Sequence, residues 1–192
     1  MPLGIWLKAG TSATALALAM AGTATAATAP AGESSTVQAA AVTLRYDDSR
    51  AAGWEAAIAA GVASWNANVS NVRLVEAAPG SAAEIVIVAT TGWPQATLGP
   101  VRPGRQVRVE LGSQAVAQGY NKTRIAAHEL GHSLGLPDTK PGPCSQLMSG
   151  SSAGTACTNA TPNTTERSRV QSAYASGTAA LAPTDQTLID AP

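Results

Sequence analysis

The chain holds two histidines, His128 and His132, and both lie four residues apart in the stretch RIAAHELGHSLGLPD, Arg124 to Asp138. On a helix of about 3.6 residues per turn, positions i and i+4 share one face, so both imidazole rings can point at one metal ion. Zinc accepts imidazole nitrogen, and a catalytic zinc takes three protein ligands and keeps a fourth position for water. The spacing therefore predicts two ligands of a zinc site.

The residue after the first histidine is Glu129, which completes the pattern H-E-x-x-H. In this pattern a carboxylate beside the metal acts as a general base toward water. A structural zinc site closes its fourth position with a protein ligand and needs no neighbouring base. The intact motif favours an enzyme over the alternative, which is a secreted zinc-binding module without catalysis or a degenerate relative of an enzyme.

The third zinc ligand must be a carboxylate, because the chain has no further histidine. Asp138 is the nearest downstream candidate, and Gly135 can adopt the left-handed conformation that ends the helix and turns the chain back. The rival is Glu166, the kind of downstream Glu that another class of zinc peptidase uses. Glu166 also fits the N3 position of a capping box that Asn163 would open. Local geometry favours Asp138.

The helices and strands that must position these residues follow an N-terminal targeting segment. Residues 1–26 combine one lysine, the short apolar run TALALAMAGTA and small residues before Ala27, which predicts a signal peptide. The apolar run is shorter than the roughly 20 residues that span a bilayer. Residues 27–40 are small, polar and Pro-containing, and they predict a pro-segment or linker. The mature protein is therefore expected to be secreted and free of the membrane.

Composition bounds the size of the protein and excludes one class of partner. The chain has 192 residues, 45% of them hydrophobic, which is enough for one domain, expected at 41–177. Lys plus Arg and Asp plus Glu number 12 each, and no basic cluster is present. Binding to nucleic acid requires such a cluster, so this function is excluded.

The chain has two cysteines, Cys144 and Cys157. In an oxidising compartment they are expected to pair. Two thiolates on a metal are the alternative, but a C-x12-C spacing is too long for a zinc knuckle. The predicted disulfide closes a loop rich in Ser and Gly, and it would stabilise the fold by roughly 3 kcal/mol.

Strands and helices are expected to alternate along the domain. EIVIVAT is nearly continuous in apolar residues and predicts a central strand. QVRVEL has one apolar and one charged face, which predicts the edge of the sheet. TGWPQATLGPVRPGR, between them, is rich in Gly and Pro and predicts a loop. Two earlier strands, VTLRYD and VRLVEA, flank a helix whose apolar residues recur from Trp54 to Trp65.

Two more helices follow the strands. The motif helix is expected to begin at Asn121 or Thr123 as its cap, and the last helix lies within PNTTERSRVQSAYASG. Residues 178–192 lack both periodicity and aromatic side chains. They predict a mobile tail.

The segments HELGHSLGLPD, SWNANVSNVRLVE and GPCSQLMSG together resemble the snapalysins, small secreted neutral zinc endopeptidases of streptomycetes within the metzincin group. The resemblance runs from about residue 42 to Gly177. It implies an α+β fold, a small metzincin-like zinc-protease domain. Its twisted, mostly parallel sheet would have an antiparallel edge strand, pack on the motif helix and be followed by a C-terminal helix.

The resemblance also implies roles for individual residues. His128, His132 and Asp138 would bind one catalytic zinc ion, and Glu129 would be the general base. Met148 would form the Met-turn beneath the zinc. The pairing of the two cysteines is implied as well.

Two positions depart from the pattern of the family. The family binds calcium through an Asp and a Thr before the motif helix, and the matching residues here are Asn121 and Thr123. Asn lacks the charge that a hard cation favours. The family also has a Tyr two residues after the Asp ligand, where Lys140 stands in this chain. We expect Lys140 to point to solvent and to contribute little to turnover.

The sequence therefore predicts a secreted, monomeric zinc endopeptidase that acts on proteins or peptides. The substrate would lie extended along the edge strand at QVRVEL and pair with its backbone. By the resemblance, aromatic residues would be favoured after the cleaved bond.

Overall fold

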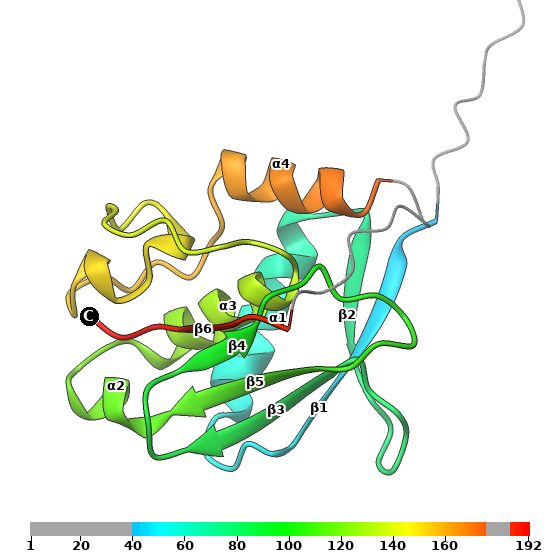
Figure 1. Cartoon of the computed structure of the whole chain (residues 1–192), viewed down its shortest axis with the longest axis horizontal. Helices are drawn as coiled ribbons and strands as arrows, with labels where there is room; N and C mark the ends of the chain where they lie inside the picture. Colours follow the sequence, from blue (N-terminus) through cyan, green and yellow to red (C-terminus); the bar gives the residue numbers. More distant parts are fainter. Residues whose placement is uncertain (1–39, 176–184) are drawn as a thin grey trace, which may run out of the picture. The chain divides into compact units, whose positions relative to one another are not determined.

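The structure, a computed structural model, describes residues 40–175 and 185–192 (Figure 1). The predicted signal peptide, and all of the predicted pro-segment except residue 40, lie outside the described residues. So do residues 178–184 of the predicted tail. The described residues all belong to one compact unit of the chain.

A six-stranded sheet carries the fold, with the strand order β2-β1-β3-β5-β4-β6. The first four strands in this order pair in parallel, whereas β4 runs antiparallel to both β5 and β6. This arrangement confirms the predicted mostly parallel sheet with an antiparallel strand at its edge. The strands are β1 (Val42–Arg50), β2 (Val72–Glu76), β3 (Ile85–Thr90), β4 (Gln95–Thr97), β5 (Val107–Gly112) and β6 (Thr187–Ile189).

The helices pack against this sheet and against each other. Helix α3, which carries the H-E-x-x-H motif, contacts β4, β5 and α1. Close approach of α1 to α3 depends on Gly61, because a Cβ there would lie 3.0 Å from the Ala127 nitrogen. Trp65 Nε1 donates a 2.8 Å hydrogen bond to the Ala127 carbonyl. The helices are α1 (Glu55–Asn68), α2 (Ser113–Ala117), α3 (Lys122–Ser133), the 3-10 segment η1 (Leu147–Ala153) and α4 (Thr164–Ala173).

The core lies between the sheet and the helices α1 and α3. Strand β3 buries four consecutive apolar residues, Ile85 to Val88, as expected of a central strand covered on both faces. The predicted helical core positions Trp54, Ile58, Val62 and Trp65 are all buried too. The hydrophobic pattern of the sequence thus identified both the central strand and the inner face of α1.

The edge of the sheet differs from its prediction. QVRVEL forms β5, which lies between β3 and β4. The two outer strands on this side, β4 and β6, come from the segments predicted to be a loop and a tail. The charged face of β5 is satisfied locally, because Glu110 accepts hydrogen bonds from Arg108 Nε and Gln95 Nε2, both at 2.7 Å. The charged side chains of β5 therefore did not identify the edge of the sheet. β4 has three residues, which are too few to show the alternating pattern of a strand.

The C-terminal segment also differs from its prediction. Instead of a mobile tail, residues 187–189 form β6, which pairs antiparallel with β4 (Figure 1). The register places Ala96 opposite Leu188. Backbone hydrogen bonds to β4 hold this segment. A three-residue strand held in this way cannot be recognised from its amino-acid composition. Asp190, directly after β6, is 5% exposed.

Candidate metal centre

Helix α3 begins and ends at the residues that the sequence singled out. Asn121 is the N-cap, and its Oδ1 accepts a 2.9 Å hydrogen bond from the Arg124 nitrogen. At the other end Gly135 has a φ of +99°. Its nitrogen donates to the His132 carbonyl at 2.9 Å, and the Leu136 nitrogen donates to the Gly131 carbonyl at 3.0 Å. This Schellman-type ending turns the chain back toward the helix.

The turn brings Asp138 to both histidines. Asp138 Oδ1 lies 3.3 Å from His128 Nε2 and 3.7 Å from His132 Nε2. In a tetrahedral zinc site with bonds of about 2.0–2.2 Å, neighbouring ligand atoms lie roughly 3.3–3.6 Å apart. The three atoms therefore lie at about the separations that a single zinc ion between them requires.

Several buried polar atoms at this point have no hydrogen-bond partner. They are His128 Nε2, His132 Nε2, Asp138 Oδ1 and both carboxylate oxygens of Glu129. Buried polar atoms in folded proteins nearly always have partners, so a cluster of unpartnered ones needs an explanation. The two histidines and Glu129 are 0% exposed. A cation bound between these donor atoms would satisfy them.

Backbone carbonyls orient the two imidazole rings. His128 Nδ1 lies 3.0 Å from the Leu147 carbonyl oxygen, and His132 Nδ1 lies 2.7 Å from that of Leu136. A carbonyl oxygen can only accept, so each Nδ1 carries a proton and donates it. The other nitrogen, Nε2, then presents its lone pair to the site. This is the arrangement by which proteins hold metal-binding histidines.

The charges of the site favour a cation in its centre. Burial lowers the pKa of His128, but the nearby carboxylates of Asp138 and Asp190 outweigh it and raise that pKa to about 9. Burial and the charge on His128 lower the pKa of His132 to about 4. Burial raises the pKa of Glu129 well above its ordinary value. The carboxylates of Asp138 and Asp190 therefore favour positive charge at this point of the structure.

Met148 lies against the middle of the motif helix. A Cβ on Gly131 would lie 2.6 Å from Met148 Sδ and 3.1 Å from Trp65 Cζ2. Gly131 therefore lets two large buried side chains approach the helix between the two histidines. A glycine inside a helix destabilises it by about 1 kcal/mol relative to alanine. The close packing of Met148 and Trp65 against Gly131 has to offset this cost.

Glu166 supports this methionine and does not reach the histidines. It closes the predicted capping box with Asn163. Its carboxylate also accepts hydrogen bonds from the backbone nitrogens of Met148, at 2.8 Å, and Leu147, at 3.2 Å. Glu166 thus holds the segment whose Leu147 carbonyl orients His128. The sequence pattern predicted that Glu166 closes the capping box. It did not predict the hydrogen bonds from η1 to Glu166.

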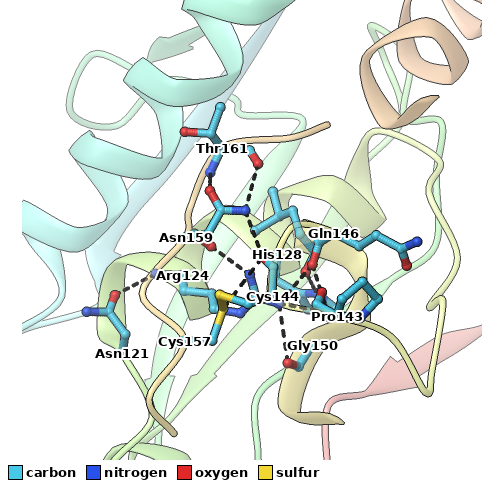
Figure 2. Close-up of a disulfide and its surroundings, with 12 residues drawn as sticks. Asn121, Arg124, His128, Pro143, Cys144, Gln146, Gly150, Cys157, Asn159 and Thr161 are labelled. Carbon is cyan, nitrogen blue, oxygen red and sulfur yellow. Dashed lines mark hydrogen bonds between the residues drawn. A yellow bond between two sulfur atoms is a disulfide. The ribbon is translucent and has the colours of Figure 1, made fainter. Parts of the chain in front are cut away.

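The predicted disulfide between Cys144 and Cys157 is present, with the Cα atoms 5.5 Å apart. Figure 2 shows Arg124 from α3 beside it. The Arg124 guanidinium donates to the Asn159 carbonyl at 2.6 Å and to the Gln146 carbonyl at 3.0 Å. The motif helix and the disulfide-bonded loop are therefore joined directly.

The calcium expectation receives no support. Asn121 Oδ1 accepts the hydrogen bond of the helix cap, and an Asn lacks the charge that calcium favours. Within the residues that the structure describes, the groups of acidic and histidine side chains able to hold a metal lie elsewhere. These groups are His128 with His132 and Asp138, and His128 with Glu129 and Asp190.

Lys140 does not point to solvent, so that prediction is wrong. Its Nζ lies 2.6 Å from Asp190 Oδ1 and donates to the Ala191 carbonyl at 2.9 Å. Asp190 in turn places its Oδ2 4.0 Å from His128 Nε2. Asp190 was not identified from the sequence as part of the site, because Asp190 follows a strand that only the fold reveals.

Comparisons with known proteins show the family to which the chain is similar. Residues 41–177 match the model of the Streptomyces extracellular neutral proteinase (M7) family. The chain is 44% identical over 144 residues to the extracellular small neutral protease of Streptomyces coelicolor, a match that covers 75% of this chain and 65% of that protein. A relative of the same name from Streptomyces caespitosus is 39% identical over 136 residues, which cover 71% of this chain and 99% of that protein. The match thus spans just under two thirds of the first relative.

Two solved structures are also similar. The first is archaemetzincin from Methanopyrus kandleri, with a TM-score of 0.46 and 13% identity, covering 72% of this chain and 98% of that one. The second is high choriolytic enzyme 1, a hatching enzyme zinc-protease from Oryzias latipes. It has a TM-score of 0.38 and 25% identity, covering 52% of this chain and 46% of that one. Separately, none of the helices within residues 40–175 has the length and hydrophobicity that a membrane span requires.

Proposed function

The chain belongs to the Streptomyces extracellular neutral proteinase (M7) family, and on this premise we propose that it is a secreted zinc endopeptidase. His128, His132 and Asp138 bind the zinc ion, and Glu129 is the general base. One observation carries the proposal, namely the unpartnered buried donor atoms of these four residues, which converge on one point. The names of the relatives, extracellular small neutral proteases, support both secretion and proteolysis.

The donor set suits zinc. Two imidazole nitrogens and one carboxylate oxygen are ligands that zinc accepts in catalytic sites, where three protein ligands leave one position for water. The carbonyls of Leu147 and Leu136 fix both imidazoles in the tautomer that binds metal through Nε2.

Zinc bound here would acidify a water molecule and polarise the carbonyl of the bond to be cleaved. Glu129 takes the proton from the attacking water and returns it to the amine nitrogen as the carbon–nitrogen bond breaks. Burial raises the pKa of Glu129, which makes its carboxylate a stronger base than an exposed one. Its two oxygens have no other hydrogen-bond partner.

The substrate chain would lie along β4. The segment directly after β4 is tied to the end of the motif helix by two backbone hydrogen bonds, from the Gly99 nitrogen to the His132 carbonyl and from the Val101 nitrogen to the Ser133 carbonyl. A Cβ on Gly99 would lie 2.0 Å from the Ser133 oxygen, so only glycine fits there. An extended peptide pairing with β4 would therefore pass the histidines.

The second candidate function is a zinc-binding module without catalysis. Glu129 argues against it, because a structural site has no use for a buried carboxylate without partners beside the metal.

The test is to measure zinc content and casein cleavage for the wild-type chain and for Glu129→Gln. We expect about one zinc per chain in both proteins, chelator-sensitive cleavage by the wild type, and a rate roughly 100-fold to 10,000-fold lower in the variant. Cleavage by Glu129→Gln at the wild-type rate would refute the assigned base. A zinc-loaded wild-type protein that cleaves nothing would favour the binding module.

A further inference from the structure

Strand β6 occupies the edge of β4 on which the substrate would lie. Besides the pairing of Thr187 to Ile189 with β4, the Asp190 nitrogen donates to the Pro94 carbonyl and the Leu98 nitrogen donates to the Gln186 carbonyl, both at 2.8 Å. The segment 186–190 is therefore bound as an extended, antiparallel peptide (Figure 1).

The residue that follows β6 enters the metal centre. The Asp190 Oδ2 atom lies 4.0 Å from His128 Nε2. One ligand atom each of His128, Glu129 and Asp190 lie within 4.8 Å of one another. A carboxylate oxygen is itself a zinc ligand. Asp190 therefore approaches the region between the metal and the general base, where water and the substrate carbonyl have to bind.

A cradle of η1 residues and Lys140 holds this carboxylate. Asp190 Oδ1 accepts a 2.9 Å hydrogen bond from the Ser151 nitrogen and pairs with Lys140 Nζ at 2.6 Å. The next carbonyl, of Ala191, accepts from Ser151 Oγ at 2.8 Å and from Lys140 Nζ. A Cβ on Gly150 would lie 2.3 Å from Asp190 Oδ1 and 2.9 Å from Lys140 Cε. The cradle fits the aspartate closely.

The attachment of β6 to the sheet is nevertheless slight. The strand has three residues, and Ile189 is 55% exposed. Few apolar contacts and a short ladder are the features of a segment that opens locally at a low free energy.

We propose that the segment Gln186–Ala191 is an internal inhibitor of the active site. β6 fills the peptide-binding edge of β4, Asp190 occupies the open face of the metal centre, and Lys140 acts as a positioning residue for Asp190. A protein substrate binds after this segment is displaced. The inference rests on the proposed zinc endopeptidase function and adds a regulatory device to it.

The test uses the full-length chain with Asp190→Asn, which keeps the acceptor for the Ser151 nitrogen and removes the charge. The matched control is Asp185→Asn, which lies directly before this segment and is exposed. The probes are a fluorogenic peptide substrate and a peptide hydroxamate that chelates zinc. For Asp190→Asn we expect the hydroxamate to bind roughly 10-fold tighter or more and kcat/KM to rise similarly, because only open molecules bind. The control should match the wild type.

A third readout is independent of turnover. In the cobalt-substituted protein, the visible absorption spectrum reports the ligands of the metal, so it should change in Asp190→Asn and stay unchanged in Asp185→Asn. Equal hydroxamate affinity and equal spectra for wild type and Asp190→Asn, with zinc bound in both, would overturn the internal inhibitor while leaving the proposed function intact. Failure of every variant to bind zinc would overturn the proposed function and the inference with it.

A second route remains if Asp190→Asn does not fold. Lys140→Met removes the partner of Asp190 and should likewise tighten hydroxamate binding. A synthetic peptide of residues 185–192, added at millimolar concentration to Lys140→Met, should compete with the hydroxamate more strongly than the same peptide with Asn at position 190. Equal competition by the two peptides would contradict the role of Asp190.

Discussion

At the scale of single residues, the candidate metal centre consists of buried donor atoms that have no hydrogen-bond partner. His128 and His132 have their Nδ1 atoms engaged by carbonyls, so their Nε2 atoms are available to a metal ion. Asp138 and Glu129 differ in their surroundings. Asp138 lies within 3.7 Å of both Nε2 atoms, whereas Glu129 is fully buried without partners. This difference supports the proposal that Asp138 is a zinc ligand and that Glu129 is the general base.

Asp138→Ala tests the assignment of the third ligand. The variant should bind zinc more than about 100-fold more weakly, since even losing an outer-shell partner weakens binding by about 10-fold to 100-fold. Competition with a chelator measures this affinity. Glu166→Gln is the control and should keep wild-type affinity. The reverse pattern would make Glu166 the ligand.

At the scale of elements, contacts between segments hold the residues of the site. Glu166 on α4 binds the backbone of η1, and η1 contributes both the carbonyl that orients His128 and the methionine beneath Gly131. Arg124 on α3 binds the loop that the disulfide closes. The motif helix is thus braced from the side opposite to the sheet.

Glu166→Ala should destabilise the fold by about 3–7 kcal/mol. The loss of a cap alone accounts for about 1 kcal/mol. The two buried nitrogens of Leu147 and Met148 would also lose their acceptor, at about 1–3 kcal/mol for each unsatisfied group. Urea denaturation of the zinc-loaded protein measures the change, with Glu76→Ala, at an exposed position, as a control expected to have a smaller effect. A loss of 1 kcal/mol or less would show that the η1 contacts contribute nothing.

Gly131→Ala should destabilise the protein by about 1–3 kcal/mol, the range for overpacked cores, although alanine favours helices. The reason is the 2.6 Å approach of the new Cβ to Met148 Sδ. A double-mutant cycle with Met148→Ala should show a favourable coupling, because shortening Met148 relieves the clash. Purely additive free energies of unfolding would contradict this packing.

The pairing of β4 with β5 should contribute to the pH dependence of stability. Hydrogen bonds from Arg108 and Gln95 lower the pKa of Glu110. A lowered folded-state pKa gives stability above the ordinary Glu pKa of about 4.3, and this stability is lost as the pH falls below it. The difference in unfolding free energy between wild type and Glu110→Gln should therefore shrink from pH 6 to pH 3.5. A difference that grows on acidification would contradict the lowered pKa.

At the scale of the whole molecule, metal binding and folding should be linked. The donor atoms come from α3 and from the loop after it, and an unfolded chain does not hold them together. A ligand that binds the folded state stabilises it by about 4 kcal/mol at 1,000 times its Kd. EDTA should therefore lower the Tm, and zinc should restore it while magnesium should not. An unchanged Tm after verified removal of zinc would contradict this linkage.

The sequence by itself determined the parts of the site that are local in the chain. The spacing of His128 and His132, the neighbouring Glu129 and the helix-ending Gly135 predict α3 and its metal-facing side, because one turn of helix sets their geometry. The hydrophobic pattern of the sequence likewise predicted the buried strand β3 and the inner face of α1. So was the pairing of two cysteines in a secreted chain.

Only the tertiary structure decided which segments far apart in the chain meet at this site. β4 and β6 have three residues each, too few for periodicity, and their pairing depends on hydrogen bonds that any residue but proline can make. The turn of Lys140 toward Asp190 followed from that pairing. From the sequence alone, a charged side chain on a loop is expected to be solvated, and only the fold shows that an opposite charge lies beside it. The position of β6 and Asp190 at the proposed substrate edge therefore could not be predicted from the sequence.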